Sequence, residues 1–389
     1  MTVIIKKAET EEELDIVQDM TTYAFEPSPV KERDKSIRKY NKNNYIYLLY
    51  DNEIPVSTLD SIPMTQNVRG KIFKMQGIAG VATHPEERKK GYSKELIKYA
   101  LTQAQKADFA FSTLYPFRQS FYAKFGYITF PHIREMIFNP SNLQDILKAE
   151  TKGEITRVHI KNNIDRFYSF LKNYQESKHG MGLFEELLTQ SLKESNYWIA
   201  FFNVNGNDEG MMVFKTSGFE KELTILEMLY TNVNAKYSLL KYIATHTDQF
   251  VKVRCKIFAD ETPENWGNDF KLSIKSRDVV PSTMGRILDI SKIGGMKVGE
   301  GSLSIEVEDK YAPWNTKIWQ FTSSNGILEV KESESAELKM NINGLSAIIY
   351  GGHSIDDFQF KGWAEMNDMQ KQKLITLFPN KTPTLYEQF

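Results

Sequence analysis

The fold of this protein is decided by one stretch of its sequence, Ile78-Ala79-Gly80-Val81-Ala82-Thr83-His84-Pro85-Glu86-Glu87-Arg88-Lys89-Lys90-Gly91-Tyr92-Ser93. Its apolar first half predicts a strand that ends at Thr83, and a helix is predicted to begin near Gly91 or Tyr92. A strand, a loop and a helix in this order aim several backbone N–H groups at one spot, where the positive end of the helix dipole also lies. Such a nest suits a pyrophosphate, and Gly91 allows a close approach because it has no Cβ. The alternative is a solvated basic turn in which Gly91 only caps the helix.

The segments around this stretch predict an α/β unit. Strand patterns occur at 45–50, 54–64, 71–83 and about 108–115. Thr10 and Glu13 have the spacing of a capping box, which predicts an N-terminal helix. We expect this first domain to span 1–145.

The order of these elements repeats weakly in the next part of the chain. Strand patterns at 197–202, 211–217 and 223–231 are followed by another helix. The basic loop is missing from this second copy, where Asn232-Val233-Asn234-Ala235-Lys236 stands instead. We therefore predict an internal duplication, in which a degenerate second domain at 146–283 has lost the ligand loop.

The pattern changes again near residue 284. Short alternating strands follow, with helical patches near 342–349 and 366–377. The segment 377–389 is apolar and holds two prolines, whereas frayed tails are usually polar and small. We expect a third domain at 284–389 whose last residues dock. The predicted fold class is α/β (α+β): two domains that each have a mixed sheet flanked by helices, followed by a C-terminal α+β domain.

Composition excludes several classes of protein. A chain of 389 residues suggests two to three domains at about 150 residues each. The 49 Lys and Arg residues balance 50 Asp and Glu residues, so the overall basic excess of a dedicated nucleic-acid binder is missing. The single cysteine and the six scattered histidines disfavour a disulfide framework and a metal site. No apolar run reaches the roughly 18 residues of a membrane helix, and no signal peptide is predicted. We expect a soluble, cytoplasmic protein that binds neither membranes nor nucleic acid.

The motif Val81-x-Thr83-x-Pro85-x-x-Arg88-x-x-Gly91-x-Ser93 resembles the acetyl-CoA signature of the GNAT (GCN5-related N-acetyltransferase) superfamily, R/Q-x-x-G-x-G/A. Ser93 stands where that signature has Gly or Ala. The resemblance implies that the strand end pairs with the pantetheine amides and that the loop backbone holds the pyrophosphate. The implied cofactor-binding residues are Val81, Ala82, Thr83, Arg88, Lys89, Lys90, Gly91, Tyr92 and Ser93.

A second stretch, Leu114-Tyr115-Pro116-Phe117-Arg118-Gln119-Ser120-Phe121-Tyr122-Ala123-Lys124-Phe125-Gly126-Tyr127, resembles the Y-x-x-F-G-Y segment of the enhanced intracellular survival (Eis) acetyltransferases. Proteins of that family have a GNAT domain, a second copy without a CoA loop, and a domain like sterol carrier protein 2. They end at an aromatic residue whose carboxylate enters the active site, and this chain ends at Phe389. The resemblance also implies a homo-hexamer, which the sequence alone cannot show.

The resemblance implies a mechanism of direct acetyl transfer to an amine. Tyr122 would be the general acid that protonates the departing CoA sulfur, since a phenol with a pKa near 10 is protonated at neutral pH. The alternative is that Tyr122 is part of an aromatic core. The Phe389 α-carboxylate would be the general base, although an unperturbed carboxylate with a pKa of about 3.5 is a weak one.

The implied substrate is a small cationic amine, such as an aminoglycoside or a lysine side chain. Carboxylates and aromatic walls suit such a substrate. We expect Phe25 with Glu26, and Tyr386 with Glu387, to provide them, although surface acids and core aromatics would look the same in sequence. Two other functions stay open: a tandem-GNAT acyltransferase for another amine, and a CoA- or lipid-responsive binding protein.

Overall fold

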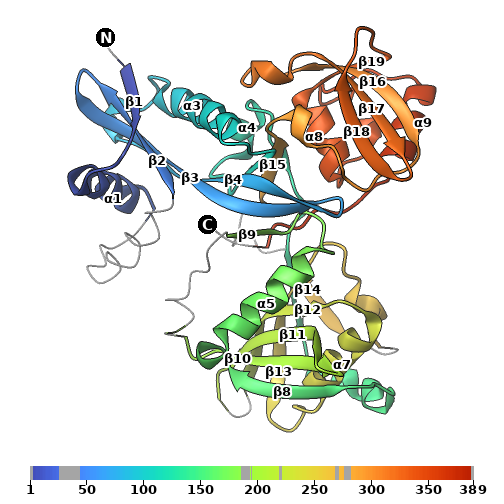
Figure 1. The fold of residues 1–389 in the computed structure, drawn as a ribbon. Coiled ribbons are helices and arrows are strands. Elements are labelled where there is room, and N and C mark those ends of the chain that lie inside the picture. Colours follow the sequence, from blue (N-terminus) through green and yellow to red (C-terminus); the bar gives the residue numbers. More distant parts are fainter. Residues whose placement is uncertain are drawn as a thin grey trace. The chain divides into compact units, whose positions relative to one another are not determined.

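The computed structural model describes residues 3–25, 44–184, 193, 195–218, 221–267, 271–275 and 282–386. The chain forms two compact units (Figure 1). The first unit comprises Met1–Phe130, His179–Glu185 and Ser282–Phe389, and the second comprises Pro131–Lys178 and Glu186–Pro281.

The first unit is built on an eight-stranded sheet in the described part of the chain, with the order β1-β2-β3-β4-β5-β15-β6 and with β9 beside β3. Its strands are β1 (Val3–Lys7), β2 (Tyr45–Asp51), β3 (Ile54–Val68), β4 (Lys71–Thr83), β5 (Phe111–Leu114), β6 (Ile128–Thr129), β9 (Gly182–Phe184) and β15 (Met284–Ile287). Helices α1 (Glu11–Phe25) and α3 (Tyr92–Lys106) lie on opposite faces of this sheet (Figure 1). The strands predicted around the loop are therefore present, and α3 begins where the sequence predicts.

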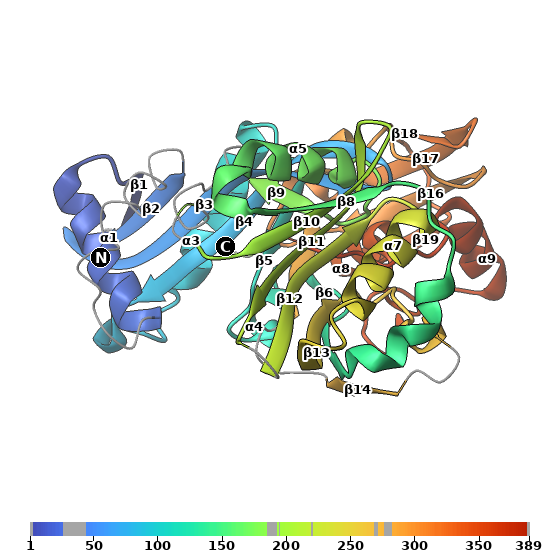
Figure 2. The ribbon, with the colours of Figure 1, turned by 90° about the horizontal axis from the view of Figure 1, so that it is seen from below.

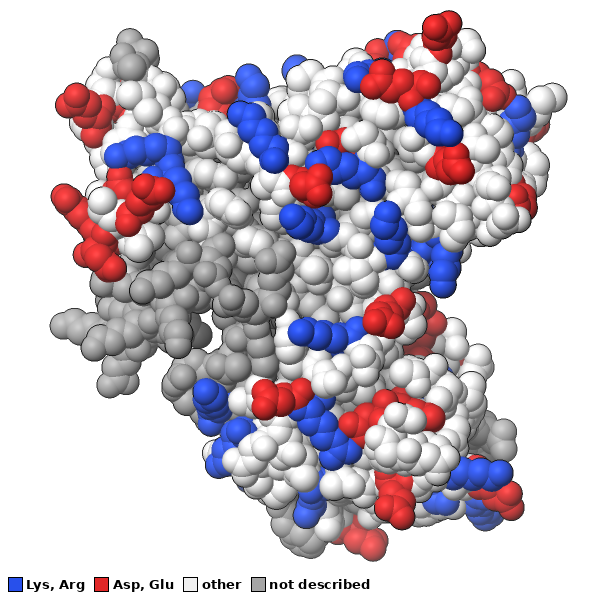
Figure 3. Space-filling view, viewed as in Figure 1, with Lys and Arg blue, Asp and Glu red and all other residues white. Residues whose placement is uncertain are grey.

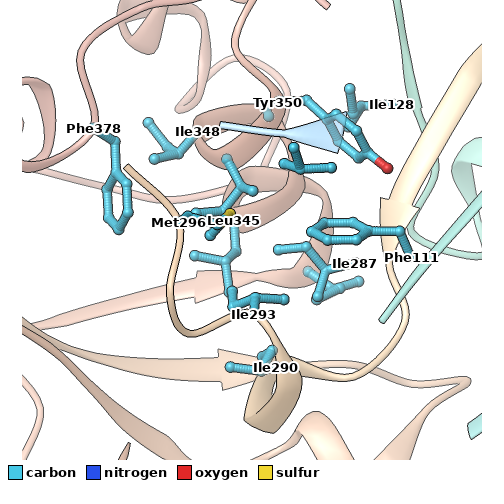
Figure 4. Packing of buried hydrophobic residues seen from close by; sticks show 14 of the residues in the cluster. Phe111, Ile128, Ile287, Ile290, Ile293, Met296, Leu345, Ile348, Tyr350 and Phe378 are labelled. Atoms are coloured by element: carbon cyan, nitrogen blue, oxygen red, sulfur yellow. The ribbon is translucent and has the colours of Figure 1, made fainter. Parts of the chain in front are cut away.

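A smaller, four-stranded sheet with the order β18-β17-β16-β19 completes the first unit. Its strands are β16 (Gly301–Glu308), β17 (Ile318–Ser324), β18 (Ile327–Glu332) and β19 (Leu338–Asn341), and its helices are α8 (Ile342–Tyr350) and α9 (Asp368–Leu377). Both sheets of this unit share one apolar core. Figure 4 shows Phe111 and Ile128 from the large sheet packed with Leu345 and Tyr350 from α8.

The second unit contains a seven-stranded sheet with the order β14-β7-β13-β12-β11-β10-β8. Its elements are β7 (Arg134–Phe138), β8 (Glu154–His159), α5 (Ile164–Gln175), β10 (Trp198–Val204), β11 (Asn207–Thr216), β12 (Lys221–Tyr230), α7 (Val233–Ala244), β13 (Phe250–Ile257) and β14 (Leu272–Lys275). Figure 2 shows α5 and α7 on opposite faces of this sheet. The series β10, β11, β12, α7, β13 has the strand directions of β2, β3, β4, α3, β5, since in both series the last pair alone is parallel. The predicted duplication is thus present in the topology.

The two units do not follow the boundaries that the sequence suggests. β7 falls inside the predicted first domain of 1–145, yet it pairs with β13 and β14 of the second sheet. β15 was expected to start the third domain, yet it pairs with β5 and β6 of the first sheet. The physical reason is that a hydrophobic pattern shows which residues are buried in a strand but not which sheet the strand joins.

The surface is mixed in charge. Acidic and basic side chains are interspersed on the face that Figure 3 shows, as the balanced composition leads one to expect. None of the helices in the described ranges is long and apolar enough to span a membrane.

Candidate active site

The last residues of β4 have an open edge. β4 pairs with β5 only from Met75 to Ile78, because β5 ends at Leu114, whereas β4 continues to Thr83. On its other edge β4 stays paired with β3, across an irregularity where Gly80 has a φ of +57°. Residues 79–83 therefore present backbone groups on one side that no described strand pairs with. A ligand that carries amide groups could bind along this edge as a further strand does.

The loop after β4 forms an anion nest at the start of α3. Pro85–Glu87 make a short 3₁₀ helix, and Lys89 and Gly91 then adopt left-handed φ angles of +68° and +94°. Gly91 is the N-cap of α3, and no side chain caps this end. The backbone N–H groups of residues 89–93 donate to no acceptor within the described ranges. Together with the helix dipole, these groups suit a phosphate.

The three basic side chains of the loop differ in their contacts. Arg88 is exposed, and its Nε donates to the Thr83 carbonyl at 3.3 Å, which holds the loop against the end of β4. Lys90 forms an ion pair with Glu87 at 2.5 Å, so part of its charge is already balanced. Lys89 is exposed. Arg88 and Lys89 are therefore the better placed of the three for an incoming anion.

Ser93 has a structural reason to differ from the glycine or alanine of the signature. Its Oγ lies 2.9 Å from Thr83 Oγ1, which in turn lies 2.7 Å from Ser57 Oγ. Three hydroxyl groups thus connect β3, the end of β4 and the first turn of α3. Tyr92 is buried, and its hydroxyl donates to Asp51, which raises the pKa of Tyr92 to about 12. The side chains of Ser93 and Tyr92 fix the loop, and only their backbone N–H groups face the nest.

The second copy has closed the corresponding nest with its own side chain. Asn232 is the N-cap of α7, and its Oδ1 accepts the N–H of Ala235 at 2.9 Å. Lys236 is paired with Glu261 at 2.5 Å. The N–H group that an anion would need is therefore already hydrogen-bonded within the protein. This explains in physical terms why the second copy lacks an anion-binding loop.

Tyr122 lies on the short helix α4 (Gln119–Ala123) and is only 3% exposed. Its ring packs against Phe121 and Phe117, with centroids 5.0 and 5.6 Å away. Burial raises the pKa of Tyr122 above its ordinary value, so the phenol stays protonated at neutral pH. None of the hydrogen bonds within the described ranges involves its hydroxyl. The aromatic-core alternative and the general-acid prediction both fit this environment, so the catalytic role stays a prediction.

The apolar C-terminal segment docks onto the first unit. Arg69 Nη1 donates to the Pro379 carbonyl at 3.0 Å, and the Thr384 N–H donates to the His179 carbonyl at 3.1 Å. Leu385 is 2% exposed and belongs to the core that the two sheets share. Docking therefore continues at least to the residue before Tyr386.

The predicted substrate residues are only partly described. Phe25, at the end of α1, is 57% exposed, and Tyr386 is partly buried. Glu26, Glu387 and Phe389 lie outside the described residues.

Sequence reasoning missed two charged residues of β3 and its hairpin. Arg69 is fully buried and donates to the carbonyls of Ile348 and Ile349 as well as to that of Pro379. Burial lowers its pKa to about 10. Asp60 lies opposite the irregularity at Gly80. The sequence could have indicated Asp60, because it is a charged residue inside a strand whose neighbours are predicted to be buried. No local sequence pattern distinguishes Arg69 from a surface arginine.

Comparisons with known proteins agree with this geometry. The model of the acetyltransferase (GNAT) domain matches residues 5–130, and the model of the sterol carrier protein domain matches residues 290–386. Among the curated proteins, no sequence matches this chain.

Several solved structures share the whole fold. A probable N-acyltransferase from Enterococcus faecalis superposes with a TM-score of 0.84 at 22% identity, and covers 100% of both chains. A GCN5-related N-acetyltransferase from Anabaena variabilis superposes with a TM-score of 0.85 at 21% identity, over 99% of each chain. Eis1 from Mycobacterium abscessus superposes with a TM-score of 0.80 at 13% identity, over 100% of each chain. At these identities the likeness establishes the fold, and it confirms the predicted fold class.

A GNAT domain transfers an acyl group from an acyl-CoA to a small amine, which fits the nest and the open edge of β4 described above. The protein is therefore an acyltransferase with a GNAT acetyltransferase domain at residues 5–130 and a sterol carrier protein domain at residues 290–386, and its fold is shared with Eis1 over the whole chain.

Proposed function

We propose that this protein transfers the acetyl group of acetyl-CoA to primary amines of a cationic substrate, such as an aminoglycoside or a lysine side chain. The observation that carries the proposal is the anion nest at residues 89–93 directly after the open edge of β4. The pyrophosphate would bind the nest and Arg88, and the pantetheine amides would pair along residues 81–83. The thioester would then lie where β4 continues beyond the end of β5.

The proposed chemistry has an acid and a carboxylate. Tyr122 would protonate the CoA sulfur as it leaves, and its raised pKa keeps that proton available. The Phe389 α-carboxylate would bind the substrate ammonium as the general base of the family mechanism. Docking of the chain up to Leu385 supports this, because it holds the segment that leads to Phe389 against the first unit. We also propose, from the family resemblance alone, that the protein assembles as a homo-hexamer.

The test of this function is thiol release from acetyl-CoA with a panel of aminoglycosides, polyamines and lysine peptides. We expect turnover with at least one of them, and mass spectrometry should find one or more acetyl groups on the product. A protein with one glycine added after Phe389 should lose turnover, whereas an N-terminal tag should not. Absence of turnover with every amine would contradict the function, and normal turnover of the extended protein would contradict the role of Phe389.

The anion nest can be tested by a matched pair of substitutions at Gly91. Asn and Asp have nearly the same size and tolerate positive φ better than other side chains. A Cβ at this position meets nothing within 4 Å, so neither variant crowds the loop. Only Gly91→Asp brings a negative charge to the phosphates. We expect its KM for acetyl-CoA to exceed that of Gly91→Asn at least about tenfold, since unit charges about 4 Å apart interact by about 1–4 kcal/mol near a surface. Equal KM values would place the pyrophosphate elsewhere.

A further inference from the structure

Asp60 lies on the face of the first sheet that α1 covers. Asp60 pairs with Ile46 on β2 and with Ala79 on β4, so these three side chains share one face. Ile46 packs in a core cluster with Val17 and Met20 of α1. The neighbouring Leu59 points to the other face, where it packs in a cluster with residues of α3.

The carboxylate of Asp60 has no hydrogen-bond or ion-pair partner among the residues that the structure describes. Its Oδ1 atom is shut off from solvent and forms no hydrogen bond within the described ranges. Gly80 follows Ala79, the pairing partner of Asp60, and a Cβ on Gly80 would lie 3.3 Å from Asp60 Cγ. Because Gly80 also has a φ of +57°, glycine is the residue that fits beside this carboxylate.

Asp60 as a whole is only partly exposed, and a carboxylate oxygen that is shut off from solvent without a partner is unfavourable for the fold. Withdrawing a carboxylate oxygen from water costs free energy unless a hydrogen bond or a counter-charge compensates. Burial alone raises the pKa of Asp60 to about 7. A structural aspartate in a strand is expected to find a donor, so the observed environment indicates that a cationic ligand supplies the missing interaction.

The surroundings of Asp60 connect it to the proposed active site. It faces Ala79 and Gly80, which begin the open edge of β4. Farther along β3, Ile62 shares one core cluster with Leu385 of the docked C-terminal segment. Tyr122 packs instead with Leu59 and the α3 residues, on the opposite face of the sheet. Asp60 and Tyr122 thus lie on opposite faces of the same sheet.

We propose that the Asp60 carboxylate binds the ammonium group of the substrate and takes its proton before acetyl transfer. This inference rests on the proposed function and adds a catalytic residue to it. The two carboxylates would then share the role of base: Phe389 binds and orients the ammonium, and Asp60 receives the proton that leaves it.

The proton transfers balance. The substrate enters as R–NH₃⁺ and gives one proton to Asp60, and the freed lone pair forms the C–N bond with the thioester carbonyl carbon. The C–S bond breaks, its electron pair leaves on sulfur, and the Tyr122 hydroxyl protonates the thiolate. A second nitrogen proton restores the Tyr122 phenol, and Asp60 releases its proton to solvent. The products are the amide, the CoA thiol and one proton.

The test compares Asp60→Asn with Asp19→Asn, which removes an exposed charge from α1. We expect Asp60→Asn to lower kcat/KM for the amine at least about 100-fold, as expected for loss of a general base. KM for acetyl-CoA should stay within about threefold of wild type, since the nest is untouched. At pH 8 its melting temperature should equal or exceed that of wild type, because an uncompensated charge has been removed. Asp19→Asn should match wild type in all three measurements.

Two results would overturn the role of Asp60. One is an Asp60→Asn protein that keeps kcat/KM within about threefold of wild type. The other is a variant that melts well below wild type, which would show that the carboxylate supports the fold. Thermal-shift binding of kanamycin in the presence of CoA separates this inference from the proposed function, since it needs no turnover. We expect kanamycin to stabilise wild type but not Asp60→Asn, and an equal shift in both would also overturn the role of Asp60.

Discussion

Replacing Tyr122 by phenylalanine is expected to lower kcat about 10²- to 10³-fold while the protein stays folded and still binds acetyl-CoA. The substitution removes one hydroxyl and keeps the ring that packs against Phe117 and Phe121. Since no described residue hydrogen-bonds that hydroxyl, its loss leaves no protein partner unsatisfied. The effect should therefore appear in kcat, measured by thiol release, and not in the melting temperature.

Tyr127→Phe is the matched control for this experiment. Tyr127 is also fully buried, and the centroid of its ring lies 6.2 Å from that of Tyr122. Its hydroxyl, however, is hydrogen-bonded to Ser112 Oγ at 2.7 Å. We expect this variant to lose about 1 kcal/mol of stability and little activity. If Tyr122→Phe turned over at the rate of Tyr127→Phe, Tyr122 would be part of the aromatic core and not the acid.

The largest expected effect on stability comes from the ion pair between Arg286 and Asp309. Arg286 lies on β15 of the large sheet, and Asp309 follows β16 of the small sheet. Both side chains are almost completely buried, and Arg286 also donates to the carbonyl of Phe125. Asp309 accepts further hydrogen bonds from the backbone of Tyr311 and Ala312, at 3.2 and 3.1 Å. The pair thus joins the GNAT domain to the sterol carrier protein domain.

Asp309→Ala is expected to cost about 3–5 kcal/mol of unfolding free energy, because it leaves the Arg286 guanidinium buried without a counter-charge. Urea unfolding measures the loss. The double variant Arg286→Met with Asp309→Leu should regain much of it, since no buried charge remains. The control is Glu332→Ala, which removes an exposed ion pair with Lys317 at 2.5 Å. It should lower the free energy of unfolding by less than about 1 kcal/mol. Similar losses for Asp309→Ala and Glu332→Ala would show that the buried pair is not what joins the two domains.

The sequence predicted the features that depend on neighbours along the chain. The strand 71–83, the basic loop and the start of α3 at Tyr92 all follow from local periodicity and from one glycine with a positive φ. The features that it missed depend on partners far away in sequence. Arg69 bonds to carbonyls about 280 and 310 residues later, and β15 pairs with strands more than 150 residues earlier. No local pattern carries that information.

Asp60 is intermediate between these two cases. Its charge inside a strand is visible in the sequence, but its meaning depends on the irregular pairing with β4 and on the missing partner of Oδ1. The aromatic environment of Tyr122 was predicted in part, because Phe121 and Tyr127 stand in the same stretch of sequence and both rings pack against it. What its hydroxyl contacts could not be read from that pattern.

The position of β15 between β5 and β6 has a consequence for how the chain is made and divided. β5 and β6 are synthesised early, but the strand that joins them arrives only with residues 284–287. Until then the edges of β5 and β6 are unpaired, and unpaired strand edges are templates for aggregation. A fragment cut after the GNAT domain would keep those edges permanently, so the smallest soluble piece of this enzyme should include the strand that closes its first sheet.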